Sequence, residues 1–146
     1  MRSSTIEVRE QLMRLKREKL KLEAPTSFSR FLGYSNPKYE LEWFHKLIAD
    51  HCQMLLEGKI KNLMVFMPPQ HGKSEIISRN FPAWALGQNP DLKIVGCSYS
   101  SDLAQQFSRS IQRTIDSKEY QAIFPATYLN GCLLYTSDAA DDTPCV

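Results

Sequence analysis

A short stretch near the middle of the chain combines the residue types that hold a phosphate chain. Residues 72–74 are Gly-Lys-Ser. A glycine lets the backbone approach an anion, a lysine supplies positive charge, and a serine hydroxyl can ligate Mg²⁺. An apolar run of strand length, residues 63–67, precedes them and is stopped by two prolines. Apolar residues at helical spacing follow them: Ile76, Ile77, Phe81 and Trp84. Because strand, tight turn and helix in this order form the setting of a phosphate-binding loop, the sequence predicts one over residues 68–74.

The prediction gives the residues of this loop distinct roles. Lys73 would reach the β- and γ-phosphates of ATP as a point charge, and Ser74 would ligate Mg²⁺. Backbone N–H groups at the start of the following helix would surround the phosphates. The predicted nucleotide-binding residues of the loop are Pro69, Gln70, His71, Gly72, Lys73 and Ser74. The usual pattern begins with a glycine where this chain has Met67, so a surface turn with a solvated lysine is the alternative interpretation.

The elements around the loop predict an α/β fold. Residues 63–67 and residues 93–99 are expected to be buried parallel strands, because both are short and rich in apolar residues. Pro82 is expected to kink or end the helix that follows the loop. Other helices are predicted over residues 5–23, 38–57 and 103–117, with a C-cap at Gly58 and an N-cap within residues 100–102. Three arginines are candidates for phosphate contact or, alternatively, solvated surface residues: Arg79, Arg109 and Arg113.

The loop and its flanks resemble one protein family. Residues 66–75, Phe-Met-Pro-Pro-Gln-His-Gly-Lys-Ser-Glu, are similar to the Walker A segment of phage terminase large subunits, the ATPases that drive DNA into a procapsid. Many of these lack the leading glycine. Further similarities follow in order at residues 43–45, 56–60, 81–84, 89–90, 98–100, 103–104, 107–109 and 120–125. The resemblance covers about residues 27–125. It departs at Gln70, where members often carry arginine, so charge stabilisation in the transition state is not expected from that position.

The resemblance implies a fold, a cofactor and partners. The fold would be an incomplete P-loop NTPase domain of the helicase-like (ASCE) class, preceded by N-terminal helices and binding ATP with Mg²⁺. An aromatic element before the loop would contact adenine through Tyr39, Trp43 or His45, with plain packing as the alternative. The parent protein would couple ATP hydrolysis to translocation of double-stranded DNA and would cut concatemeric DNA. It would work in the host cytoplasm, as a ring on the procapsid, with the small terminase subunit and the portal protein.

The catalytic acids of such a motor are not expected in this chain. A Walker B strand, whose aspartate holds Mg²⁺ next to a glutamate that polarises water, does not follow residue 125, and neither does a nuclease domain. We therefore expect nucleotide binding without a complete catalytic site. Two other functions stay open: a helicase or recombination ATPase, and a non-enzymatic helical adaptor that binds DNA or a partner protein through its basic first helix.

Composition places limits on these interpretations. The chain has 146 residues, 42% of them apolar and 23% charged, with a net charge of +2, which suits one domain. No apolar run is long enough to span a membrane, and four cysteines without C-x-x-C spacing favour neither zinc nor disulfides. Residues 1–26 form a predicted basic amphipathic helix, with Val8, Leu12, Leu15 and Leu22 on one face. Its charges indicate either contact with DNA or a partner, or a solvated face.

The last residues are interpreted separately. Residues 132–141, Cys-Leu-Leu-Tyr-Thr-Ser-Asp-Ala-Ala-Asp, resemble the in-frame translation of a sequencing-library adapter. Residues 132–146 are therefore predicted to be a non-native tail, with a genuine acidic tail as the alternative. The ATPase segment is then expected to occupy residues 27–131.

Overall fold

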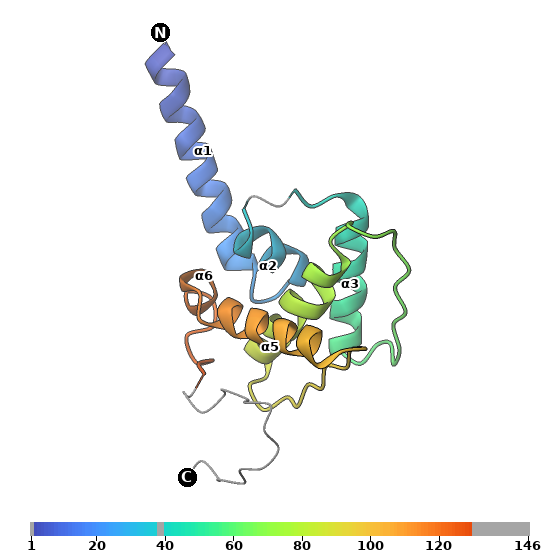
Figure 1. Ribbon diagram of the computed structural model, residues 1–146. Coiled ribbons are helices and arrows are strands. Elements are labelled where there is room, and N and C mark those ends of the chain that lie inside the picture. The colour runs from blue at the N-terminus through green and yellow to red at the C-terminus, as the bar shows by residue number, and fades with distance from the viewer. Residues whose placement is uncertain (1, 38–39, 130–146) are drawn as a thin grey trace.

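The computed structural model describes residues 2–37 and 40–129, with side chains described from Ile6 onward. These residues form a helical body from which the first helix projects (Figure 1). The elements, in order, are α1 (Arg2–Glu23), α2 (Phe28–Ser35), α3 (Trp43–Leu56), the π-helix η1 (Glu75–Asn80), α4 (Phe81–Gln88), α5 (Ser101–Ile115) and α6 (Lys118–Gln121). Tyr39 and the predicted tail, residues 132–146, lie outside the described residues. None of the helices described is both long and apolar enough to cross a membrane.

The centre of the body is a cluster of aromatic side chains contributed by α2, α4 and the region of α6. Phe28 packs against Trp84 with 5.3 Å between ring centroids, and Phe31 meets Tyr120 edge-on at 6.1 Å. Phe124 completes the cluster, with its ring centroid 5.2 Å from that of Tyr120. Phe28, Phe31 and Tyr120 have no exposed surface. Because aromatic rings bury the largest apolar areas, this cluster supplies much of the driving force for folding.

The turn between α1 and α2 is fixed by polar side chains from the body. Trp84 donates from its indole N–H to the carbonyl of Ala24 at 3.0 Å. Gln53 donates to the carbonyl of Thr26 at 3.1 Å and accepts from the N–H of Phe28 at 3.2 Å. These bonds satisfy backbone groups that the end of one helix and the start of the next leave unpaired.

The helices predicted from apolar spacing are confirmed, with shifted ends. The helix expected over residues 38–57 begins at Trp43, because Glu42 caps it in a reciprocal pair of bonds with His45. Gly58 follows it with a φ of 72°, the left-handed conformation that commonly ends helices. The helix expected over residues 103–117 is α5, and its predicted N-cap is confirmed: the Ser100 hydroxyl accepts from the N–H of Leu103 at 3.3 Å.

The α/β prediction is wrong: no strand and no sheet is present among residues 2–37 and 40–129. Residues 62–68 and 93–98, here called the unpaired segments, fall where strands were expected. Neither makes a backbone–backbone hydrogen bond with any other residue that the structure describes. Apolar content alone does not make a strand, because its backbone groups must pair with a neighbouring chain segment. Within the described part of the chain, no segment pairs with either one.

The first unpaired segment nevertheless keeps the alternation of a strand. Leu63, Val65 and Met67 pack against the core cluster. Met64 and Phe66 point the other way and are 82% and 90% exposed. The residues of this apolar run therefore alternate between two faces as in a strand, but only one face has neighbours and neither edge is hydrogen-bonded.

The helix that follows residues 68–72 does not end at Pro82. It runs from residue 73 to Gln88, and it widens into η1 just before the proline. In η1 the N–H of Phe81 bonds to the carbonyl of Ile76, one residue further back than in an α-helix. Because a proline ring clashes with the carbonyl four residues earlier in an α-helix, the wider turn accommodates Pro82 without breaking the helix.

Candidate anion-binding loop

Residues 69–72 form a tight turn between the first unpaired segment and the helix that begins at residue 73, and the predicted loop of residues 68–74 spans this turn and the residues next to it. Two residues of the loop have positive φ: Gln70 at 65° and Gly72 at 77°. Glycine adopts this conformation without steric cost, whereas a residue with a side chain does so rarely. These two positions reverse the chain sharply, so that it enters the helix directly after Gly72.

The loop presents a row of backbone N–H groups. Within the described residues, the N–H groups of residues 70–75 have no acceptor on the protein, and the first bond of the helix runs from the N–H of Ile76 to the carbonyl of Gly72 at 3.1 Å. Successive free N–H groups in a turn with left-handed positions, continued by a helix N-terminus, attract anions through their dipoles. The backbone of this loop therefore presents hydrogen-bond donors of the kind that attract an anion.

A histidine from α3 holds the loop in place. His45 is buried, and its Nε2 donates to the carbonyl of His71 at 3.0 Å. Its Nδ1 accepts from the N–H of Glu42 at 3.1 Å, which fixes this neutral tautomer. His71 in turn donates from Nδ1 to the carbonyl of Pro69 at 2.8 Å. The start of α3 and the loop, far apart in the sequence, are joined by these bonds.

An aromatic group stands beside this connection. Phe44 lies near both histidines, with its ring centroid 4.1 Å from that of His45 and 6.3 Å from that of His71. Trp43 meets Phe44 edge-on at 5.8 Å and is itself 73% exposed. Phe44 was not among the residues predicted to contact the nucleotide. Its position directly before His45, on the first turn of a helix, was the signal that could have found it.

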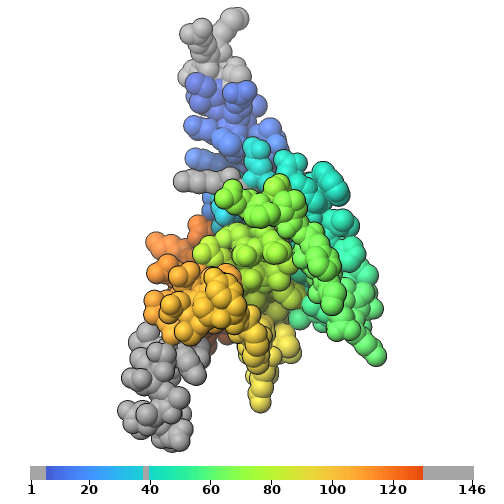
Figure 2. Space-filling view, turned by 45° about the vertical axis from the view of Figure 1, so that its right-hand side comes forward, coloured from blue at the N-terminus to red at the C-terminus, as the bar shows by residue number. Residues whose placement is uncertain are grey.

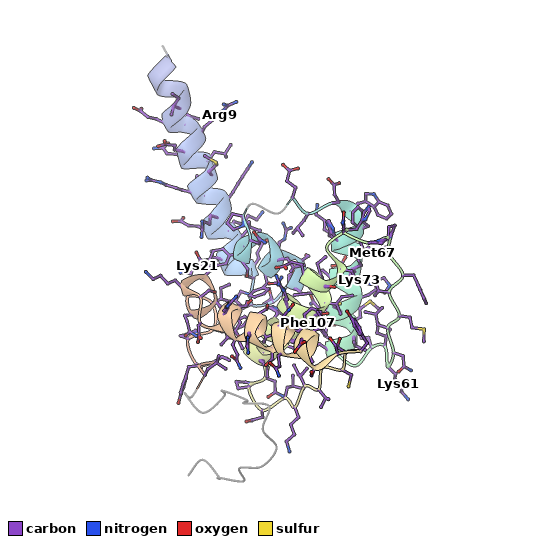
Figure 3. All side chains as sticks on the ribbon, viewed as in Figure 1. Arg9, Lys21, Lys61, Met67, Lys73 and Phe107 are labelled. Atoms are coloured by element: carbon purple, nitrogen blue, oxygen red, sulfur yellow. The ribbon has the colours of Figure 1, made fainter. Side chains whose placement is uncertain are left out.

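The side chains of Lys73 and Ser74 face solvent, as do those of Gln70 and His71. Neither Lys73 nor Ser74 makes a hydrogen bond or ion pair with another described residue. Figure 3 places Lys73 close to the helix start, with Met67 at the near end of the unpaired segment and Lys61 at its far end. Lys73 and Ser74 also line a cavity of about 260 Å³, together with Cys52, Leu55, Leu63, Val65, Ile77, Ser78 and Phe81.

The carboxylate next to the loop is paired. Glu75 Oε2 accepts from Arg79 at 2.7 Å, and Asn80 donates to the carbonyl of Glu75 at 2.7 Å. A free carboxylate here would repel an anion, and the arginine compensates its charge. Arg79 is thus engaged within its own helix, and Arg109 donates to Gln105 at 3.4 Å, also within its helix. The structure therefore brings neither arginine to the loop, and it places Arg113 on the exposed side of α5.

Comparison with known proteins places the chain in one family. Residues 64–139 match the family model described as terminase large subunit, T4likevirus-type, N-terminal. The matched range contains the loop and all elements from η1 to α6, and it extends into the segment interpreted as a tail. No curated protein and no solved structure matches the chain. Because the family model covers more than half of the sequence, the chain belongs to the T4-like terminase large subunit N-terminal family.

Proposed function

We propose that residues 68–74 bind the triphosphate of Mg²⁺-ATP, as the nucleotide-binding loop of a terminase large subunit. The observation that carries the proposal is the row of N–H groups in residues 70–75 that have no acceptor among the described residues. Lys73 and Ser74 stand exposed at the same place, so a charge and a hydroxyl accompany the backbone donors. Family membership favours a nucleotide over another phosphate compound.

In this proposal each residue of the site acts on a different part of the nucleotide. The backbone of Gln70, His71 and Gly72 surrounds the phosphates, Lys73 neutralises the β- and γ-phosphates, and Ser74 ligates the Mg²⁺ that bridges them. Pro69 fixes the entry of the loop and accepts from His71. His45 acts as a positioning residue, because its ring joins the loop to α3.

For the adenine base we propose Trp43 as the stacking partner. Its ring is largely exposed and lies next to Phe44, which contacts the loop histidine. Exposed aromatic rings near a phosphate site suit stacking on a base, because every base has a flat apolar face. Tyr39 stays a second candidate from the sequence.

The wider function follows from the family and is part of the same proposal. The parent protein would use ATP hydrolysis to move double-stranded DNA into a procapsid, in a ring assembled with the portal protein and the small terminase subunit in the host cytoplasm. Cutting of the DNA would belong to a nuclease domain of that parent. The present chain would supply the nucleotide-binding loop.

Isothermal calorimetry with a non-hydrolysable Mg²⁺-ATP analogue tests the proposal on the full chain. Lys73→Ala should weaken binding at least about tenfold, because a charge-assisted hydrogen bond contributes about 1.5–3 kcal/mol. Lys61→Ala is the matched control: this lysine is also exposed and lies at the far end of the unpaired segment, so its loss should leave binding unchanged. Equal weakening by both variants would mean nonspecific attraction to positive charge and would refute the loop as the site.

The helical structure gives one alternative some support. A non-enzymatic adaptor, in which Gly72-Lys73-Ser74 is incidental, would need no sheet, and the described residues form none. In that case the folded wild-type chain would not bind the analogue, and Lys73→Ala would change nothing.

A further inference from the structure

The first unpaired segment alternates like a strand but has no partner strand. It runs along the outside of the body beside α3, at the molecular surface (Figures 1 and 2). One face packs on the core cluster, and neither edge makes a backbone–backbone hydrogen bond with another described residue. Because this packing already restrains the backbone, pairing with a second strand costs less entropy than it would for a free segment. The segment is therefore a preorganised edge for a strand from outside the body.

The residues of the segment do not oppose such pairing. Proteins protect exposed strand edges with charged side chains, prolines or bulges. Residues 62–67 contain no charged residue and no proline, and Pro68 marks the end of the stretch that can donate hydrogen bonds. On the outer face, Met64 and Phe66 are 82% and 90% exposed. A strand that joins this edge would bring side chains against both of them.

The second unpaired segment lacks these properties. Residues 93–97 are all exposed, and neither Ile94 nor Val95 packs against the core cluster. The segment also carries a charge at Lys93 and a glycine at position 96, which weakens a strand. Pairing would have to order this segment completely. The first unpaired segment is therefore the one that we expect to pair.

We propose that the first unpaired segment pairs with the same segment of a second copy of the chain, as two antiparallel strands related by a two-fold axis at Val65. Residues at equal distances from Val65 would then lie opposite each other: Leu63 opposite Met67, and Met64 opposite Phe66. All the opposed residues from 63 to 67 are apolar, so the segment complements its own reversed sequence. On the outer face, the sulfur of each Met64 would contact the Phe66 ring of the other copy.

Charge selects the antiparallel arrangement. In a parallel pair in register, Lys61 of one copy would lie beside Lys61 of the other, and like charges in this position oppose pairing. In the antiparallel pair, Lys61 would lie opposite Pro69, away from its counterpart. The edge also offers no counter-charge to a strand that carries charges, so such a strand would lose hydration without compensation. The uncharged sequence of the segment itself avoids this cost, which favours a second copy as the occupant.

The pair is expected to be weak. Two strands without further neighbours are marginally stable in water, even though here each strand also packs on its own body. We therefore expect a dissociation constant on the order of 10–100 µM. Denaturation experiments at about 1 µM would then measure the monomer.

Sedimentation velocity on the full chain, from about 1 µM to about 300 µM, tests the proposal. The wild type should change from monomer to dimer over this range. Phe66→Lys should weaken dimerisation at least about tenfold, because it removes the ring opposite Met64 and places a charge on the edge. Val95→Lys is the matched control, since Val95 is 85% exposed and the change in net charge is the same. It should change the dissociation constant less than about twofold.

Two double variants test the antiparallel register. Met64→Lys combined with Phe66→Glu would place opposite charges across the two-fold axis, whereas Met64→Lys combined with Phe66→Lys would place like charges there. Both remove the same apolar side chains, so the pairs differ in charge. The first should dimerise at least about fivefold more tightly than the second. Amide hydrogen exchange of residues 63–67 in the wild type should slow as the protein concentration rises, because pairing protects N–H groups.

Four results would overturn the proposal, with circular dichroism showing all variants folded. The first is a wild type that stays monomeric over the whole concentration range. The second is a dimer that Val95→Lys weakens as much as Phe66→Lys does, which would place the interface elsewhere. The third is equal dimerisation of the two double variants, which would exclude the antiparallel register. The fourth is a dimer whose residues 63–67 exchange as fast as in the monomer, which would exclude backbone pairing.

Discussion

Two phenylalanines in the same small chain have opposite surroundings. Phe31 on α2 has no exposed surface, whereas Phe66 in the first unpaired segment is 90% exposed. Both belong to apolar stretches of the sequence. The helix pairs its backbone groups within itself and needs neighbours only for one face. The segment around Phe66 needs a neighbour for each edge as well, and the described residues supply none. An apolar stretch thus indicates side chains that can be buried, but not whether its backbone finds hydrogen-bond partners.

Replacing each of these two phenylalanines by alanine gives the largest expected difference in the free energy of unfolding. Phe31→Ala should lower the free energy of unfolding by about 3–5 kcal/mol, because it opens a cavity within the aromatic cluster. Phe66→Ala should change it by less than about 0.5 kcal/mol, as is usual for exposed side chains. Urea denaturation followed by circular dichroism measures both. A large loss from Phe66→Ala would show that the unpaired segment packs against something in solution, including another copy of the chain.

Two glycines extend the comparison to the backbone. A Cβ at Gly87 in α4 would lie 2.5 Å from the Phe124 ring, whereas a Cβ at Gly96 in the second unpaired segment would meet nothing within 4 Å. Gly87→Ala should therefore destabilise the chain by about 1–3 kcal/mol, despite the higher helix propensity of alanine. Gly96→Ala should have an effect within about 0.5 kcal/mol, measured by the same denaturation. If Gly87→Ala were stabilising, the contact between α4 and Phe124 would have to be looser than the structure has it.

The sequence predicted what local interactions decide. The helix of residues 101–115, its Ser100 cap and the left-handed Gly58 follow from spacing and from residues whose conformational preferences act locally. The position of the loop also followed, from its prolines and glycine. The prediction of strands was wrong, because the backbone of a strand must pair with a segment that is distant in the sequence. The bond from His45 to the loop and the contact of Phe44 with His71 could not be predicted, because they join parts of the chain that only the tertiary fold brings together.

Alkaline pH should act on the core through two buried groups. Burial raises the pKa of Cys52 to about 11 and that of Tyr120 to about 12, from ordinary values of 9.0 and 10.0. Tyr120 also donates to the carbonyl of Ala83 at 2.9 Å, a bond that its ionised form cannot make. Between these ordinary and raised values, the unfolded chain releases protons that the folded chain retains. The free energy of unfolding therefore falls as pH rises from 9 toward 12, by at most about 1.4 kcal/mol per pH unit for each group.

Variants of the two groups show whether the helical core is the source of this pH dependence. Tyr120→Phe keeps the ring and removes the proton, so it should lower stability by about 1 kcal/mol at pH 7 and flatten the decline above pH 10. Cys52→Ala should flatten the decline between pH 9 and 11. Urea midpoints measured across this range give the slopes. If the free energy of unfolding of the double variant fell with pH as steeply as that of the wild type, the titrating groups would have to lie outside the aromatic cluster and α3. The packed core would then differ from the unpaired segments in packing but not in how it binds protons.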